Sequence, residues 1–158
     1  MTMSKVEQRL AALGVTLPAP AAPIANYTPF VRAGSLVIIS GQLCLGPEGK
    51  IAPQHVGRVG AGVSAADAAS AARLCAINVL AQLRACIGDL DRTLRCLRLG
   101  GFINAAPDFD ALAGVMNGAS DFMVEALGDA GRHARSTVGV ASLPLSAVVE
   151  VEGMFEVR

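Results

Sequence analysis

Apolar residues recur at helical spacing along residues 64–87, and this pattern predicts the longest helix of the chain. Ser64 is placed to cap its first turn, Asp67 stands at the third helical position, and Gly88 follows the last apolar residue. The apolar stripe consists of Ala68, Leu74, Ile77, Leu80, Ala81, Leu83 and Ile87. A helix with such a stripe is expected to cover a hydrophobic core.

Two shorter helical segments are expected, one on each side of this helix. Residues 4–13 open with Ser4 and Glu7, whose spacing is that of a capping box, and Gly14 ends the pattern. A second helix is expected from about residue 108 to residue 127, where the apolar positions again recur at helical spacing.

Alternating apolar and polar residues predict strands in both halves of the chain. The expected strands are residues 30–32, 35–40, 94–103, 136–141 and 147–157. A bulge at Gly41-Gln42, with the second strand continuing beyond it through residues 43–45, is left open. Ala33-Gly34 predicts a hairpin turn between the first two strands, and Leu143-Pro144 predicts a turn between the last two. The last strand alternates small and apolar residues with acids, which is typical of a sheet with one covered face.

Strands combined with long helices, and a hairpin expected at each end, predict an α+β fold in which two helices pack on one face of a mixed β-sheet. The length of 158 residues suits a single domain. Residues 1–22 are expected to form an N-terminal helix and a Pro-rich extension, and residues 23–158 the domain itself. No targeting signal and no apolar run of about 20 residues is visible, so we expect a cytoplasmic protein without a membrane segment.

The composition limits the partners that the protein can have. Lys and Arg together number 13, as do Asp and Glu, so the net charge is zero and a broad nucleic-acid-binding surface is not expected. Hydrophobic residues make up 53% of the chain and charged residues only 16%, against about 25% in a typical domain. So small a charged fraction indicates that subunit association hides part of the surface.

The cysteines and histidines give no sign of a metal centre. The four cysteines lack CxxC spacing and the chain has only two histidines, so we expect no metal site. Free thiols in a reducing compartment are the expected state of these cysteines.

An arginine and two acids stand out in the C-terminal strands. Arg135 precedes the apolar run of one strand, and Glu150 and Glu152 alternate with valines in the next. A guanidinium at a half-buried strand needs a partner, because burying it without one is costly. Either Glu150 or Glu152 is that partner, or the planar fork of the guanidinium grips the carboxylate of a ligand. His133 is expected to lie exposed at the strand end.

Six short segments along the chain form a set. They are Pro29-Phe30-Val31, Ile39-Ser40-Gly41-Gln42, Met116-Asn117, Arg135-Ser136-Thr137-Val138, Leu143-Pro144 and Val149-Glu150-Val151-Glu152. The set resembles the signature of the Rid family, the reactive intermediate deaminases that are also called YjgF-like or L-PSP proteins. The resemblance spans residues 23–157, and its terminal block together with Ser-Gly-Gln is more specific than any single piece.

This resemblance implies a chorismate-mutase-like α+β fold, assembled as a homotrimer with a cleft between each pair of subunits. Family members with the arginine hydrolyse reactive enamines and imines, such as 2-aminoacrylate, to 2-keto acids and ammonia, and need neither a metal nor an organic cofactor. The resemblance implies that Arg135 holds the substrate carboxylate and that Glu150 orients the attacking water. The other implied contacts are the Gly41 backbone, Asn117, Phe30 at the position of the usual tyrosine, and Thr137 where many members carry cysteine.

A non-catalytic role remains open beside this one. Phe30 lacks the hydroxyl of the tyrosine that it replaces, and such a site also suits a protein that only binds a small carboxylate. That protein would use Arg135 in the same way and would have no need of Glu150 to position water. Ribonuclease activity, an older idea for some relatives, is disfavoured by the neutral charge and by the scarcity of aromatic residues.

Overall fold

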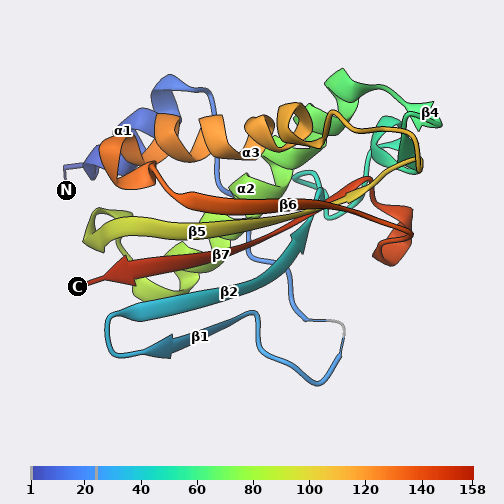
Figure 1. Cartoon of the computed structure of the whole chain (residues 1–158). Coiled ribbons are helices and arrows are strands. Elements are labelled where there is room, and N and C mark those ends of the chain that lie inside the picture. The colour runs from blue at the N-terminus through green and yellow to red at the C-terminus, as the bar shows by residue number, and fades with distance from the viewer. Residues whose placement is uncertain (1, 24) are drawn as a thin grey trace.

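The computed structural model describes residues 2–23 and 25–158 and places helices against one face of a five-stranded sheet (Figure 1). The helices are α1 (Lys5–Ala12), α2 (Ala65–Ile87) and α3 (Leu112–Leu127). The strands of the sheet are β1 (Phe30–Ala33), β2 (Leu36–Leu43), β5 (Thr93–Asn104), β6 (Ala134–Val140) and β7 (Val149–Val157), while β3 (Arg58–Val59) and β4 (Gly62–Val63) form a separate pair. The predicted α+β fold, with its two long helices on one face of a mixed sheet, is therefore confirmed.

The strand order corrects one expectation about the C-terminus. The sheet runs β1-β2-β7-β5-β6, with β5 and β6 parallel and the other neighbours antiparallel. The expected pairing of the last two strands is therefore wrong, because β5 lies between them. The helix α3 connects β5 to β6, and a helical crossover of this kind joins parallel neighbours. The chain then returns through a 3₁₀ turn, η4 (Pro144–Ser146), which lets β7 pair on the far side of β5.

The α3 helix begins later than the sequence pattern predicts. Residues 107–111 form a turn instead, in which the Phe109 N–H donates to the Ala106 carbonyl. The ring of Phe109 packs against Gly60, where a Cβ would lie only 3.1 Å from that of Phe109. This tertiary contact holds the segment out of the helix.

The predicted bulge in β2 is confirmed, since the register with β7 shifts between Ile39 and Gln42.

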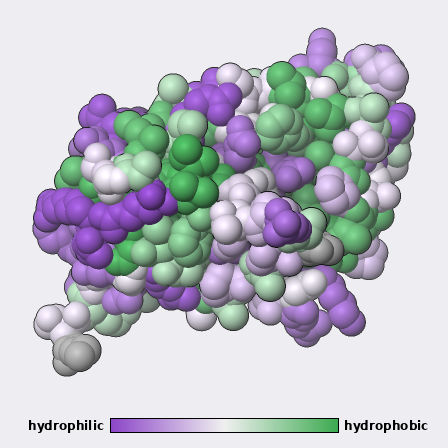
Figure 2. All heavy atoms as spheres, turned by 90° about the horizontal axis from the view of Figure 1, so that it is seen from below, coloured by the Kyte–Doolittle hydropathy of each residue, from purple (hydrophilic) through white to green (hydrophobic). Residues whose placement is uncertain are grey.

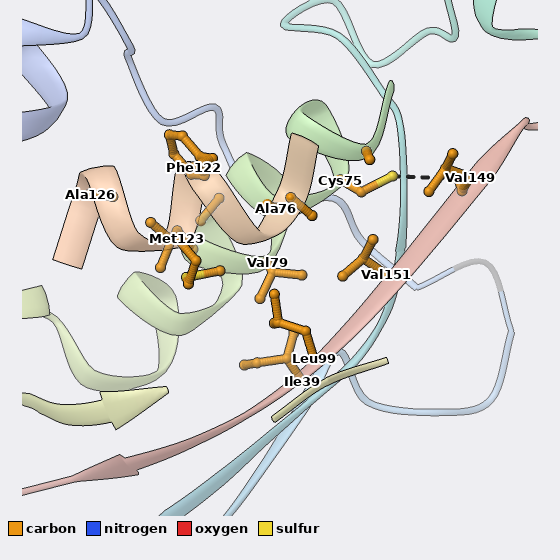
Figure 3. Packing of buried hydrophobic residues seen from close by; sticks show 14 of the residues in the cluster. Ile39, Cys75, Ala76, Val79, Leu99, Phe122, Met123, Ala126, Val149 and Val151 are labelled. Atoms are coloured by element: carbon orange, nitrogen blue, oxygen red, sulfur yellow. Dashed lines mark hydrogen bonds between the residues drawn. The ribbon is translucent and has the colours of Figure 1, made fainter. Parts of the chain in front are cut away.

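A single hydrophobic core lies between the sheet and the two long helices. Figure 3 shows Val79 of α2 between Phe122 of α3 and the side chains of Leu99 and Val151 of the sheet, and all four are fully buried. Most of α2 faces this core. Its length and apolarity would also suit a membrane span, but 61% of the apolar window is buried inside the protein, as in the core helix of a globular fold.

The N-terminal extension packs onto the same core. Val6 and Leu10 of α1 and Leu17 of the Pro-rich stretch are each at most 6% exposed. The side chains of Arg84 and Gln82, both on α2, donate to backbone carbonyls of that stretch. The capping box expected at the start of α1 is present.

A carboxylate from another part of the chain also binds the first turn of α1. Both oxygens of Asp91 accept from backbone N–H groups, those of Lys5 and Val6, at 2.9 Å each. Burial alone would raise the pKa of Asp91, but these two bonds and the charges of Lys5 and Arg9 outweigh it and hold the pKa below its usual range. The ionised carboxylate therefore stabilises the docked helix.

Replacing Asp91 with asparagine is expected to lower the free energy of unfolding by about 1 kcal/mol at neutral pH, the usual cost of losing a helix cap. Because the folded-state pKa is lowered, this stabilisation is present above the ordinary pKa of an aspartate and is lost as the pH falls through the lowered value. Urea unfolding of the wild type and the variant across this pH range measures the effect. The exposed Asp108 gives a control as Asp108→Asn, and a difference that persists in acid would contradict the role assigned to Asp91.

Candidate functional site

The residues expected at the site fall on two faces of the sheet. Arg135 lies opposite Leu99 in the register of β5 and β6, and Leu99 is buried beneath the helices, so Arg135 points to the helical face. Glu150 alternates with Val149 and Val151, which point to the helices in Figure 3, so it lies on the opposite face. The register also places β5 between the two strands that carry Arg135 and Glu150.

Helix α3 provides the protein partners of Arg135. Its Nη1 donates to Asn117 Oδ1 at 2.9 Å and to Ser120 Oγ at 3.0 Å, and its Nη2 donates to the Ala113 carbonyl at 3.3 Å. Asn117 therefore lies beside Arg135, as the resemblance implies. Among the residues that the structure describes, no carboxylate forms a salt bridge with Arg135. A bridge to Glu150 or Glu152, which the sequence left open, is not formed within the chain.

Two donor hydrogens of Arg135 remain without an acceptor among the described residues. Both hydrogens of Nη1 are needed for its two acceptors, while Nε and the second hydrogen of Nη2 have no acceptor among the described residues. Nε and Nη2 form the side-on fork that binds a carboxylate with two parallel hydrogen bonds. The half-buried Arg135 thus presents an unoccupied carboxylate-binding edge.

Thr137 follows Arg135 on the same face of β6. It lies opposite Gly101, where an added Cβ would overlap the sulfur of Met116. The Thr137 hydroxyl oxygen is buried and has no hydrogen-bond partner in the described part of the chain. Arg135, Asn117, Ser120 and Thr137 are called the anchor half-site below.

Glu150 meets Gly41 on the other face of the sheet. Gly41 lies with Ser40 in the bulge of β2, and a Cβ on it would overlap the carboxylate oxygen Oε1 of Glu150, so a side chain here would displace the acid. These two residues therefore lie next to each other within one chain. Burial, and then the nearby carboxylate of Glu152, raise the pKa of Glu150. Glu152 itself pairs with Arg98 at 3.3 Å. Gly41, Glu150 and Glu152 are called the acid half-site.

Gly41 lies close to Tyr27, a residue that the sequence pattern did not single out, while Phe30 lies at the edge of the sheet. Phe30 pairs with Ile39 and packs partly against the core from the β1 edge of the sheet. Gly41 lines a small pocket of about 80 Å³ together with Pro29 and Tyr27. Tyr27 is the only tyrosine of the chain and is 51% exposed. Its place in a Pro-rich stretch without periodicity gave no signal, because only the fold brings it to Gly41.

His133 and Ser120 were also missed as members of the site. His133 is half-buried, not exposed at a strand end as expected, and its Nε2 lies 2.9 Å from Ser120 Oγ. Its Nδ1 contacts the Gly131 carbonyl. The spacing of two between His133 and Arg135 was the available signal, since alternate strand residues share a face.

The two half-sites cannot meet within one chain, because they lie on opposite faces of the sheet and β5 separates their strands.

Over residues 2–23 and 25–158 there is no group of three His, Cys, Asp or Glu side chains that could hold a metal ion. The four cysteines are free, and Cys75 donates to the Val149 carbonyl within the core.

Comparisons with known proteins match almost the whole chain. A family model described as "YjgF/chorismate mutase-like, putative endoribonuclease" matches residues 7–157. Protein TCP17 of Trypanosoma cruzi is 42% identical over 155 residues, which cover 98% of this chain and 95% of that protein. The crystal structure of Atu1372 from Agrobacterium tumefaciens is 45% identical, with a TM-score of 0.90 over 97% of this chain and 92% of that one. Escherichia coli TdcF with bound serine is 30% identical, with a TM-score of 0.63 over 90% and 95%.

Proposed function

The chain belongs to the YjgF/chorismate-mutase-like family, the Rid proteins, and from this premise we propose that it hydrolyses reactive enamines and imines of the 2-aminoacrylate type to 2-keto acids and ammonia. The family and its fold are those that the sequence resemblance predicted. The observation that carries the proposal is the unoccupied edge of the Arg135 guanidinium, because every substrate of this class bears a carboxylate next to the reacting carbon.

The relatives support a ligand of this size and chemistry. TdcF of Escherichia coli holds serine in its crystal structure, and serine carries a carboxylate and a nitrogen on neighbouring carbons, as 2-aminoacrylate does. We infer that the carboxylate of such a ligand binds Nε and Nη2 of Arg135 in this chain. The buried Thr137 hydroxyl, which has no partner among the described residues, lies next to that position on β6.

Hydrolysis of the imine needs an anchored substrate, a positioned water and a route for protons. The water oxygen bonds to the imine carbon while the π electrons of the C=N bond move to nitrogen, which takes up a proton. The amino group of the resulting carbinolamine takes up a second proton and leaves as ammonia, while the hydroxyl loses its proton and the C=O bond forms, so that the two proton transfers of this step balance. Glu150 is proposed to accept the proton of the attacking water, and its raised pKa brings it closer to the range of an efficient general base.

The separation of the half-sites leads to a proposal about assembly. We propose that the anchor half-site of one subunit faces the acid half-site of another in a homotrimer, so that each active site lies between two copies. The outer side of the sheet has apolar surface for such a contact, since Val31, Ile38 and Val138 are at least 40% exposed. The underside of the molecule shows apolar patches between polar ones (Figure 2).

A coupled assay tests the proposed reaction. An amino-acid oxidase generates 2-imino acids in situ, and semicarbazide traps whatever imine survives. The protein is expected to reduce the semicarbazone signal in proportion to its concentration, with several amino acids compared to rank substrates. Heat-denatured protein serves as the control. If no amino acid gives faster imine loss while 2-ketobutyrate still binds, the protein is the non-catalytic carboxylate binder that the sequence left open.

Glu152→Gln is expected to shift the acid limb of the pH–rate profile to lower pH. Glu150 works as a base only when it is ionised, so the rate falls as the pH drops through its pKa. The negative charge of Glu152 raises the pKa of Glu150, so removing that charge lowers the pKa of Glu150. Arg98, released from its pair with Glu152, acts in the same direction. The measurement is kcat/KM against pH, with the exposed Glu48→Gln as control. An unmoved or raised acid limb in Glu152→Gln would rule out Glu150 as the titrating base.

A further inference from the structure

We propose that Ser120 and His133 are positioning residues, which orient the Arg135 guanidinium through a hydrogen-bond relay of fixed direction. Their function in ligand binding rests on the proposed function of Arg135, whereas the proton arrangement of the relay does not. The relay joins three elements: the 3₁₀ turn η3 (Gly128–Gly131), helix α3 and strand β6.

The chemistry of the acceptors sets the direction of each bond. The Gly131 carbonyl can only accept, so Nδ1 of His133 must carry the ring proton and donate to it. In the neutral ring Nε2 is then an acceptor, and the Ser120 hydroxyl donates to it over 2.9 Å. With its hydrogen committed to His133, Ser120 Oγ offers a lone pair to Arg135 Nη1 at 3.0 Å. Every donor along this line meets an acceptor.

The relay determines which edge of the guanidinium is free. Asn117 and Ser120 lie three residues apart on α3 and so share one face of that helix. Together they engage both hydrogens of Nη1, and with the Nη2 bond to the Ala113 carbonyl this fixes the plane of the guanidinium and leaves Nε and one hydrogen of Nη2 without an acceptor on α3. If the hydroxyl of Ser120 pointed its hydrogen at Arg135, that bond would become a repulsive contact. His133 prevents this by binding the hydrogen.

The relay gives the His133 ring a proton arrangement that a packing role alone would not require. A ring that only fills space would keep the Nε2–H form that a free neutral histidine favours, whereas the relay requires the Nδ1–H form. The tautomer of His133 therefore distinguishes a positioning residue from one that only packs.

Nitrogen-15 NMR of the histidine rings tests the proton arrangement directly. The chain has only two histidines, so His133→Gln identifies the signals of His133 by their disappearance and leaves those of His55. In the wild type, His133 is expected to carry its proton on Nδ1, with Nε2 unprotonated. Ser120→Ala is expected to keep the Nδ1–H form, because the Gly131 carbonyl still accepts from Nδ1, and to shift the Nε2 signal, because that nitrogen loses the hydroxyl hydrogen bond. An Nε2–H ring in the wild type, or an Nε2 signal that does not move in Ser120→Ala, would overturn the relay.

Calorimetric binding of 2-ketobutyrate, a small keto carboxylate, tests what the relay does for Arg135. Ser120→Ala and His133→Phe are each expected to weaken binding roughly tenfold, the cost of a hydrogen bond that orients a charged group. Ser120→Thr keeps the hydroxyl and is expected to restore most of the affinity. Ser70→Ala, at an exposed serine of α2, is the matched control.

Combining each substitution with Arg135→Ala shows whether Ser120 and His133 act on ligand binding through Arg135 or independently of it. In that background neither Ser120→Ala nor His133→Phe is expected to weaken binding further. Additive losses would overturn the positioning role even if the ring carries its proton on Nδ1. A wild type that binds no 2-ketobutyrate would instead refute the proposed function and the ligand-positioning role, while an Nδ1–H ring would still establish the relay.

Discussion

Arg135→Ala is expected to abolish imine hydrolysis, lowering kcat/KM at least about 100-fold, while the protein stays folded. The substrate carboxylate would lose two charge-assisted hydrogen bonds, each worth about 1.5–3 kcal/mol. Folding is expected to survive because Arg135 is an arginine of an edge strand whose protein partners are neutral groups on α3. Arg135→Lys keeps the charge but not the planar fork and is expected to recover only a small part of the rate.

The semicarbazide assay and circular dichroism of the same samples measure both halves of this expectation. Arg95→Ala is the matched control, since Arg95 is an exposed arginine of the neighbouring strand β5. Full activity in Arg135→Ala would remove the proposed mechanism. Loss of activity together with loss of the folded signal would show that Arg135 supports the fold, and the binding of 2-ketobutyrate to Arg135→Lys would then decide whether it also anchors the ligand.

The parts of the fold that depend on local chemistry could be predicted from the sequence. The caps of α1 and α2 follow from serine side chains three residues before a backbone N–H, and both caps are present. The two faces of β7 follow from strict alternation, in which Val149 and Val151 are buried and Glu150 is not. Such features need no information from elsewhere in the chain.

The features that depend on distant segments could not be predicted in this way. Alternation along β6 and β7 is the same whether they pair with each other or with β5, so the sequence could not reveal the order of the strands. The turn before α3 exists because Phe109 packs on Gly60, almost 50 positions earlier in the chain. A helical pattern alone therefore placed the start of α3 too early.

The site, like the fold, has features that local motifs predict and features that depend on distant segments of the chain. The motifs identified Arg135 and Glu150 as candidate site residues, and the structure brings Asn117 to Arg135 and Gly41 to Glu150. The register with β5 determines which face of the sheet Arg135 and Glu150 occupy. It places the two half-sites on opposite faces, so they cannot meet within one chain. The contact of Ser120 with His133 links a helix to a strand, and no local spacing encodes it.

Gly118→Ala is expected to destabilise the protein by about 3 kcal/mol, the upper end of the usual cost of overpacking. Gly118 lies where α3 crosses α2, and a Cβ there would overlap the Ala69 carbonyl oxygen. That oxygen belongs to a helical backbone and cannot rotate away, so the two helices must separate. Separation would also draw Asn117 and Ser120 away from Arg135, which ties this crossing to the anchor half-site.

Gly114→Ala provides the control for this prediction, because it makes the same substitution one helical turn earlier in α3. A Cβ on Gly114 would have no neighbour within 4 Å, so the variant is expected to gain up to about 1 kcal/mol from the helix propensity of alanine. Urea unfolding should therefore move the two variants in opposite directions from the wild type, and 2-ketobutyrate binding should weaken only in Gly118→Ala. Equal stability of the two variants would show that α2 and α3 adjust their crossing without cost, in which case the close approach at Gly118 does not hold the anchor half-site in place.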